Sequence, residues 1–553
     1  MCETTSVRKI FALILAVCMV LGLAAVMTAC GSGGAVDSEI SADISDADLV
    51  GNRVEAPVEN EFFTANNIEI ETVNISESDN FTGEYVEISG LKNAEVQDKI
   101  NTLIKTTVET VMDNKNPPPY RGAMAALKQY KKEDGSLEPA DSYVSADVIG
   151  NVNNILSVEI YRNVYYGDVD GEYNDAAWFN EVIPLNIDLN TGEEIKLQDL
   201  FADNVDGLEY VNRYVADELK SYDYENEDSL FFTDRYDIKL TAPFGGFEED
   251  VNFAFNSATG SITVFLDYKT PEFYIGDTGT SFARMQIPYS EYMGVTEKFM
   301  SEESLFTDET PVYWLITGDR ERGLLKRENS EEALTDLGDK VNVYRSFNYY
   351  EDQDKDFVDY ARTVYEGMGD NADFVNDVKK IREENDDVYA FFRTLVDCTN
   401  TGKYNIVYCV YEKAIEAING ENWETVESAS GTRYITLDPD TGKPMEISDI
   451  IKSEEWEDVI CQSMLKNMKD QEEYLEEDFV WAENTEEYLR AMIGEINGFT
   501  LNYDSIEFSF DSDTMADVEN YIDVNPEYYY HYSSLVRYIP YRYIGCENMS
   551  IFG

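Results

Sequence analysis

Hydrophobic residues alternate with polar or small ones on both sides of a short Asn-Thr-Gly turn near residue 190. Alternation with a period of two is typical of a half-buried strand, and glycine can take the positive φ that a tight turn requires. The alternating positions are Ile183, Leu185, Ile187 and Leu189 before the turn, and Ile195 and Leu197 after it. Residues 188–201 therefore predict a β-hairpin.

A second copy of this hairpin occupies residues 438–451, at a constant offset of 250. Apolar residues spaced by three and four follow each hairpin and predict a helix, with Asp199 as a short acceptor side chain before the first one. These residues are Leu208, Val211, Val215 and Leu219 in the first copy, and Trp456, Val459, Ile460 and Leu465 in the second.

Three further blocks repeat in the same order. Asn154–Ile160 matches Asn405–Tyr411 at an offset of 251, Ser261–Asp267 matches Ser505–Asp511 at 244, and Arg284–Tyr289 matches Arg537–Tyr541, whose Ile-Pro-Tyr is offset by 252. Chance similarity of one turn is the alternative. Four ordered blocks with similar offsets instead favour two copies of one domain that differ by loop insertions.

Helical periodicity at the start of each copy completes the predicted architecture. In the first copy a helix is expected over residues 93–114, ended by Pro117–Pro119. In the second, one helix begins near Phe357, and another is expected from about Ala372 to Val396. We predict an α+β fold with two tandem domains, each an antiparallel sheet with helices packed on one face. The domains are expected at 67–300 and 340–553, joined by a connector at 301–339.

The first residues predict export and a lipid anchor. Arg8 and Lys9 precede an apolar run over residues 10–27, as in a signal peptide, although a single transmembrane anchor is the alternative. Residues 26–30, Val-Met-Thr-Ala-Cys, resemble the lipobox of bacterial lipoproteins, which implies cleavage after residue 29 and a lipid on Cys30. Residues 30–66 are rich in Gly, Ser, Ala and acidic residues and predict a flexible acidic linker.

The composition is globular and strongly acidic. The chain has 43% hydrophobic residues, 42 Lys and Arg against 110 Asp and Glu, and a formal charge of −68. Loss of residues 1–29 removes Glu3, Arg8 and Lys9, which makes the charge −69. Such a protein repels nucleic acid and anionic membrane surfaces, so we expect neither as a partner. The acid excess indicates either a solvated surface or attraction of cations or a basic protein.

Short motifs in the first copy resemble an extracytoplasmic domain family found in lysozyme-binding anti-sigma-V factors and ahead of the catalytic domain of a peptidoglycan deacetylase. The motifs are Glu84–Asn93, Val96–Asn101, Asn154–Val158, Asp188–Gly192, Leu197–Phe201 and Ile287–Ser290. Where the family carries a Gly-Gly-Ala-His signature, this chain has residues 166–175, Tyr-Gly-Asp-Val-Asp-Gly-Glu-Tyr-Asn-Asp. The resemblance implies a non-catalytic extracellular module, of unknown function, that binds something at the cell wall.

Candidate chemistry is sparse. His531 is the single histidine, which excludes His-rich zinc sites and a Ser-His-Asp triad, whereas glycoside hydrolysis needs only two carboxylates. We expect no catalytic residues, no cofactor and no metal site. The acidic loop Asp168–Asp175 is similar to a calcium loop but lacks the EF-hand spacing, and an acidic surface loop is the favoured interpretation. Tyr528–Tyr532 suits either sugar stacking or a sheet core, and the core is favoured.

Cysteine usage leaves one question open. Cys398, Cys409, Cys461 and Cys546 remain after Cys2 and Cys18 leave with the signal and Cys30 takes the lipid. Export permits disulfides, and four cysteines allow three pairings. Cys409 aligns with Val158 on the apolar side of a strand, which favours a buried thiol. The pairing stays open.

The sequence favours a lipid-anchored extracytoplasmic binding or sensor protein whose ligand is a cell-wall fragment or a basic protein such as lysozyme. The alternative is a solute-binding lipoprotein of a transport system, which predicts two doubly wound domains, and a third reading is an acidic hydrolase. The repeated hairpin is expected to be scaffold. Binding is expected instead where the copies diverge, in residues 167–179 and 413–430.

Overall fold

The computed structural model describes much of the chain beyond the N-terminal 61 residues, and no helix among the described residues is long and apolar enough to cross a membrane. The described residues are 62–78, 81–113, 141–166, 178–219, 238–240, 244–248, 251–266, 273–275, 283–288, 298–316, 325–338, 340–350, 353–369, 371–385, 387–401, 403–419, 422–470, 485–510 and 536–552.

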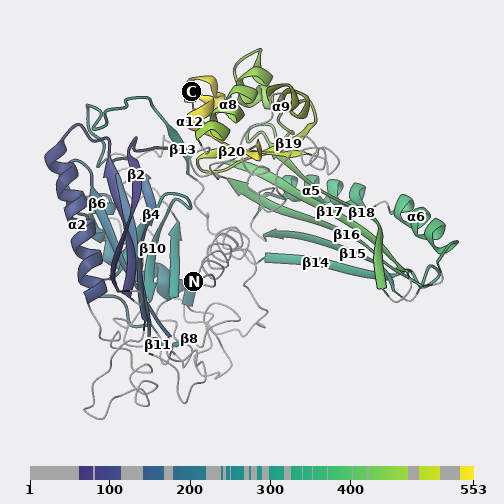
Figure 1. Ribbon diagram of the computed structural model, residues 1–553, viewed down its shortest axis with the longest axis horizontal. Coiled ribbons are helices and arrows are strands. Elements are labelled where there is room, and N and C mark those ends of the chain that lie inside the picture. Colours follow the sequence, from purple (N-terminus) through teal and green to yellow (C-terminus); the bar gives the residue numbers. More distant parts are fainter. Residues whose placement is uncertain are drawn as a thin grey trace, which may run out of the picture.

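A six-stranded sheet with one helix forms the centre of the first copy (Figure 1). The strands lie in chain order and are β2 (Glu69–Ser78), β3 (Phe81–Ser89), β4 (Asp141–Val152), β5 (Ile155–Tyr165), β6 (Trp178–Asp188) and β7 (Glu193–Glu194). Helix α2 (Ala94–Asp113) joins β3 to β4, and this pair is parallel, as a helical crossover requires. Buried Ile100, Ile104 and Val108 of α2 pack against one face of the sheet.

A five-stranded sheet with the same connectivity forms the centre of the second copy. Its strands are β14 (Leu325–Ala333), β15 (Val341–Tyr350), β16 (Val388–Thr401), β17 (Tyr404–Asn419) and β18 (Asn422–Leu437). Helices α5 (Lys355–Met368) and α6 (Ala372–Arg382) join the parallel pair β15 and β16. The predicted α+β class is confirmed, and each mainly antiparallel sheet contains one parallel pair because helices connect the paired strands. Strand β14 lies within the range assigned to the connector.

Each copy ends in a three-stranded antiparallel sheet. These sheets consist of β9 (Phe253–Asn256), β10 (Ser261–Leu266) and β12 (Ala283–Pro288), and of β19 (Ile496–Leu501), β20 (Ser505–Phe510) and β21 (Tyr538–Pro540). Ser261 pairs with Pro288, and Ser505 pairs with Pro540. These residues come from two of the repeated blocks and have the same register in both copies, so the copies correspond in structure as well as in sequence.

Further helices and a two-stranded ladder lie outside these sheets. They are η4 (Leu197–Leu200), α4 (Gly207–Glu218), α7 (Ile447–Ile450), α8 (Trp456–Asp470), α9 (Thr485–Ile493), α12 (Tyr541–Ile544), η8 (Cys546–Asn548) and η9 (Ser550–Phe552), and the paired strands β8 (Ile238–Leu240) and β11 (Phe273–Ile275). The expectation that Asp199 caps α4, the helix after the first hairpin, is wrong. Asp199 caps η4, and the side chain of Asp206 accepts the hydrogen bond that caps α4.

Two other sequence expectations need correction. The helix expected from Ala372 to Val396 ends at Arg382, and β16 begins at Val388. Buried residues alternate along β16 with the period of a strand, at Val388, Ala390, Thr394, Val396 and Cys398. Short apolar runs fit both periods, which explains the error.

The sequence alignment of residues 154–160 with residues 405–411 is also wrong, by two residues. Ser157 pairs with Asn186, whereas Ile406 pairs with Thr436, the residue 250 positions after Asn186. Ile406 therefore corresponds to Ser157 rather than to Ile155. A shift of two residues leaves every side chain on its own face of the sheet, so the sequence pattern could not detect it.

A buried side chain holds the three-stranded sheet of each copy against the central sheet. In the first copy the Asn186 amide donates to Phe253 O (2.9 Å) and accepts from Phe255 N (3.1 Å). In the second, Thr436 Oγ1 donates to Phe499 O (2.6 Å). Asn186 and Thr436 are 3% and 2% exposed, so these hydrogen bonds are shielded from water.

A short ladder joins the two copies. Strand β1 (Phe62–Thr64), within the range assigned to the flexible linker, pairs with β13 (Tyr313–Leu315). Phe63 is buried in the core of the first copy, whereas Phe62 packs with Phe552 at the core of the second (5.6 Å between ring centroids). Leu315 N also donates to Tyr503 O (2.7 Å). Successive residues of one strand thus enter two cores, as the alternation of side chains in a strand allows.

We predict that Asn186→Ala lowers the free energy of unfolding by about 3 to 5 kcal/mol, because it leaves several buried groups on β5 and β9 without partners. Thr436→Val removes one bond at the corresponding position and should cost about 1 to 2 kcal/mol. Urea denaturation of the two variants measures this difference. Equal losses of unfolding free energy in the two variants would contradict the larger role assigned to Asn186.

A second prediction concerns the crossing of β18 and β19. A Cβ at Gly498 would lie 2.0 Å from Tyr434 O, so Gly498→Ala must displace β19 and should lower the free energy of unfolding by several kcal/mol. Gly367, within α5, is the matched control because a Cβ there meets nothing within 4 Å. Gly367→Ala should stabilise the protein by up to about 1 kcal/mol. Thermal denaturation should show a lower Tm for Gly498→Ala and a higher Tm for Gly367→Ala.

Candidate functional site

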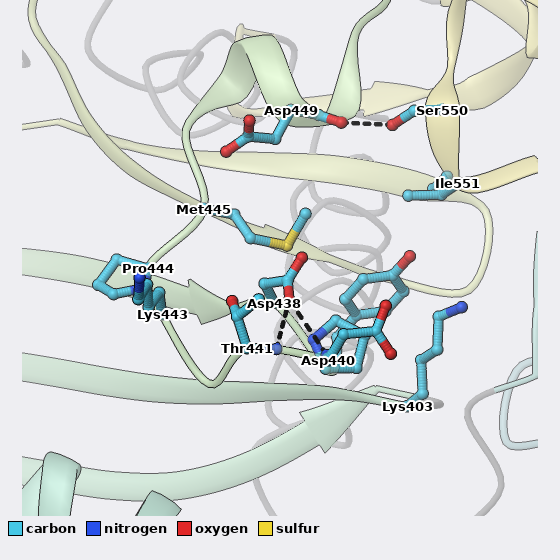
Figure 2. Close-up of a pocket in the computed structure, with 12 residues that line it drawn as sticks. Lys403, Asp438, Asp440, Thr441, Lys443, Pro444, Met445, Asp449, Ser550 and Ile551 are labelled. Carbon is cyan, nitrogen blue, oxygen red and sulfur yellow. Dashed lines mark hydrogen bonds between the residues drawn. The ribbon is translucent and has the colours of Figure 1, made fainter.

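A pocket of about 520 Å³ lies beside the second copy of the repeated hairpin (Figure 2). Four segments contribute to it: the start of β17, the turn after β18, helix α7, and the C-terminal segment that includes Ser550 and Ile551. The lining residues are Lys403, Tyr404, Asp438, Pro439, Asp440, Thr441, Lys443, Pro444, Met445, Asp449, Ser550 and Ile551.

The turn wall of the pocket is fixed by Asp438. Its carboxylate accepts hydrogen bonds from the backbone nitrogens of Asp440 (3.1 Å) and Thr441 (2.7 Å). The hydrogen bonds from Thr441 hold the pKa of Asp438 below its usual value. Gly442 closes the turn with φ of +65°, and its N–H donates to Asp438 O (2.8 Å). Asp438 is therefore a structural residue, and its acceptor capacity is largely used within the turn.

The opposite wall joins α7 to the C-terminal segment. Asp449 Oδ2 accepts from Glu446 N (2.7 Å), which caps α7, and Ser550 Oγ donates to Asp449 O. Lys452 N donates to Asn548 O (2.8 Å), so the chain end is held along α7. Figure 2 shows Met445 and Ile551 between this wall and the turn.

The lining combines both signs of charge with apolar surface. Lys403 and Lys443 contribute ammonium groups, and Asp440 and Asp449 contribute carboxylates. Lys403 Nζ lies 5.6 Å from the centroid of the Tyr404 ring. The lining includes no histidine or cysteine. This arrangement suits recognition of a small amphipathic ligand with charged ends, because polar groups orient a ligand whose body contacts apolar walls.

The corresponding turn of the first copy is covered by protein. The amides of Asn154 and Asn190 both donate to Phe299 O (2.8 Å each), and buried Phe299 joins the core. A Cβ at Gly192 would meet side chains of α2, at 3.2 Å from Lys99, whereas one at Gly442 would meet nothing within 4 Å. The two copies thus share the turn, and only the second leaves space beside it.

Most residues singled out in the sequence lie elsewhere. Cys30, the loop Asp168–Asp175, His531 and Tyr528–Tyr532 lie outside the described residues, so the lipidation and calcium expectations stay untested. Within the described part of the chain, no cluster of three or more His, Cys, Asp and Glu side chains could hold a metal ion.

The cysteine question has a structural answer. Cys398, Cys409, Cys461 and Cys546 are all buried, and all four are free thiols. Burial raises the pKa of Cys398 to about 12 and that of Cys409 to about 11, which disfavours the reactive thiolate. Cys398 and Cys409 pack against α5 in the core. The buried-thiol interpretation of Cys409 is confirmed.

The pocket residues were missed because the hairpin was assigned to the scaffold. A signal was nevertheless present in the sequence. The turn keeps Asp, Thr and Gly in both copies, but Asn190 corresponds to Asp440 and Glu193 to Lys443. The copies therefore diverge in charge at the positions that face the pocket.

Comparison with known proteins gives a limited result. No protein-family model matches the chain, and no curated protein matches it. A solved member of the DUF3298 family from Bacteroides fragilis is 15% identical, with 43% of this chain and 97% of that chain covered and a TM-score of 0.26. A DUF3298 family protein from Pseudomonas aeruginosa is 13% identical over the same shares, with a TM-score of 0.25. The chain is thus similar, over part of its length, to proteins of a family of unknown function.

Proposed function

We propose that this protein is a non-catalytic binding protein at the bacterial cell wall, held on the outer face of the membrane by a lipid on Cys30. Its ligand in this proposal is a small cell-wall fragment bound in the pocket beside the second hairpin. The observation that carries the proposal is the contrast between the copies: the same turn is covered by Phe299 in one copy and open to a pocket in the other.

The chemistry of the lining supports a muropeptide as the ligand. Lys403 and Lys443 would bind the carboxylates of its peptide, and Asp440 would bind an amine. Tyr404, Met445 and Ile551 offer apolar contacts for a sugar ring or for methyl groups. A muropeptide carries all of these groups, and the export signal would place the protein where such fragments occur.

Two other functions receive less support. A solute-binding lipoprotein of a transport system predicts two doubly wound parallel domains, which the mainly antiparallel sheets do not resemble. A hydrolase would need two carboxylates in suitable positions. Asp449 already accepts the bond that caps α7, which leaves Asp440 without a second carboxylate free for acid–base work in the pocket.

The strong negative charge favours a second binding activity, toward a basic protein such as lysozyme. A formal charge of −68 attracts cationic proteins over distances comparable with the Debye length, about 8 Å at physiological salt. This attraction involves the surface as a whole and does not require the pocket. It is therefore separable from muropeptide binding.

The pocket is tested by giving the second turn the residues of the first. The double variant Asp440→Asn and Lys443→Glu keeps Asp438, Thr441 and Gly442, so the turn should fold normally. We expect it to bind a defined disaccharide tripeptide at least tenfold more weakly, a loss of about 1.4 kcal/mol or more, by calorimetry on the soluble mature domains. Lys355→Gln, on a side chain 88% exposed, changes the net charge by the same −1 and is the matched control, which should bind normally.

Unchanged binding by the double variant would exclude the pocket as the site. Failure of the unmodified protein to bind any muropeptide would exclude the proposed ligand class.

For the second activity, we predict that lysozyme binds the mature protein at about 10 mM salt and is largely released at about 0.5 M, because screening weakens attraction between surface charges. The pocket double variant should bind lysozyme as the unmodified protein does. Surface plasmon resonance over a salt series measures both. Binding that is insensitive to salt would contradict an electrostatic origin.

A further inference from the structure

One face of the five-stranded sheet β14–β18 is not packed by the helices of its own domain. Helix α5 packs on the face that carries Phe347, Val396 and Val407, and α6 packs on the same face near Val388. Figure 1 shows the strands side by side as a broad sheet with both helices on one side of it. Among the described residues, the three-stranded sheet contacts the other face at β18 and at the start of β17, where Tyr404 joins its core.

The strand register places aromatic and polar side chains in rows across this face. One row joins neighbouring strands through Tyr344, Arg393, Glu412 and Ser430. The next row contains Asn342, Phe391, Ala414 and Ser428. The side chains of Arg393 and Glu412 are 57% and 40% exposed, and both serines are exposed. We call these two rows the platform.

Contacts within the platform hold its central arginine in place. The Arg393 guanidinium lies 5.9 Å from the centroid of the Tyr344 ring and 5.6 Å from that of Phe391. Its Nη1 also donates to Glu412 Oε2 at 3.3 Å. A side chain that is already ordered loses less conformational entropy on binding. The platform therefore presents two rings and an oriented ion pair on one flat surface.

The strands that carry the platform are longer in the second copy than in the first. Strands β16, β17 and β18 have 14, 16 and 16 residues, against 12, 11 and 11 in β4, β5 and β6. Ala414, Ser428 and Ser430 of the platform lie within residues 413–430, the divergent segment in which binding was expected. In the first copy β9 contacts β4, β5 and β6 across the corresponding face.

We propose that the platform binds a glycan chain. The apolar faces of pyranose rings stack on aromatic rings, and Tyr344 and Phe391 are partly exposed. Sugar hydroxyl and acetamido groups bond to paired charged and amide side chains such as Arg393, Glu412 and Asn342. Arg393 and Glu412 offset each other's charge within these rows, and the edge strand β14 places Glu331 opposite Tyr344. The four strands that carry the platform, spaced about 4.8 Å apart, give a surface about 14 Å wide, enough for two or three sugar units.

Other macromolecules fit the platform less well. Nucleic acid is repelled by the net charge of the chain. A stable protein interface places a desolvated apolar centre at the contact, whereas Ser428, Ser430 and Asn342 are spread through these rows. This site shares no residue with the pocket beside the second hairpin, so the two proposals stand or fall separately.

The test uses N-acetylglucosamine oligosaccharides of two to six units and peptide-free glycan strands. The oligosaccharides lack the carboxylates and amines that the charged side chains of the pocket would bind. The soluble mature protein should bind them with affinity that increases with chain length. Phe391→Ala and Arg393→Ala should each weaken binding at least tenfold in calorimetry. Phe391→Trp, which keeps an aromatic ring at this position, should bind as the unmodified protein does. Tyr143→Ala, which removes a tyrosine 39% exposed in the first copy, is the matched control and should bind normally.

The outcomes separate the platform from the pocket. The double variant Asp440→Asn and Lys443→Glu should bind glycan strands normally. Absence of glycan binding by the unmodified protein would overturn the platform proposal, as would binding that Phe391→Ala and Arg393→Ala leave unchanged. Urea denaturation of each variant checks that a loss of binding does not come from unfolding. Because the Arg393 side chain is exposed, Arg393→Ala should disturb the fold less than Phe391→Ala.

Discussion

The hydrogen bond between a central strand and the edge of a second sheet determines how each copy is built. Helices cover one face of the central sheet, and the other face must be covered by something else or remain in water. Asn186 in the first copy and Thr436 in the second reach across this gap to a backbone carbonyl of the three-stranded sheet. Because the contact is buried, it fixes where the second sheet sits. The extent of the remaining face then depends on how far the central strands continue past that point.

The two copies have the same strand connectivity and different surfaces. In the first copy, Phe299 fills the space beside the hairpin, and the three-stranded sheet crosses several central strands. In the second, the hairpin borders a pocket, and the Arg393 and Glu412 side chains of the platform are 57% and 40% exposed. Both candidate sites thus lie in the second copy. The first copy closes the space beside its hairpin with its own chain.

Local features of the fold could be predicted from sequence, and features that depend on distant contacts could not. The turn at Asp438 follows from its own residues, since Asp accepts nearby N–H groups and Gly takes the positive φ. The end of α6 at Arg382 could not be found because the apolar residues after it fit a strand and a helix equally well. The same limit applied to the site. Lys403 and Ile551 are separated by nearly 150 residues and meet only because the C-terminal segment packs along α7.

The ladder between β1 and β13 has a mechanical consequence. Phe62 and Phe63 are neighbours in one short strand, yet one packs with the core of the second copy and the other lies inside the first. If the chain is tethered through Cys30, tension from the membrane arrives at this strand before it reaches either central sheet. The load would be carried by two aromatic residues anchored in separate domains and by the three paired positions of the ladder. The ladder between the copies would then be the point at which the tether attaches to the folded protein. Pulling on the tether would change the relative position of the two domains before it unfolded either of them.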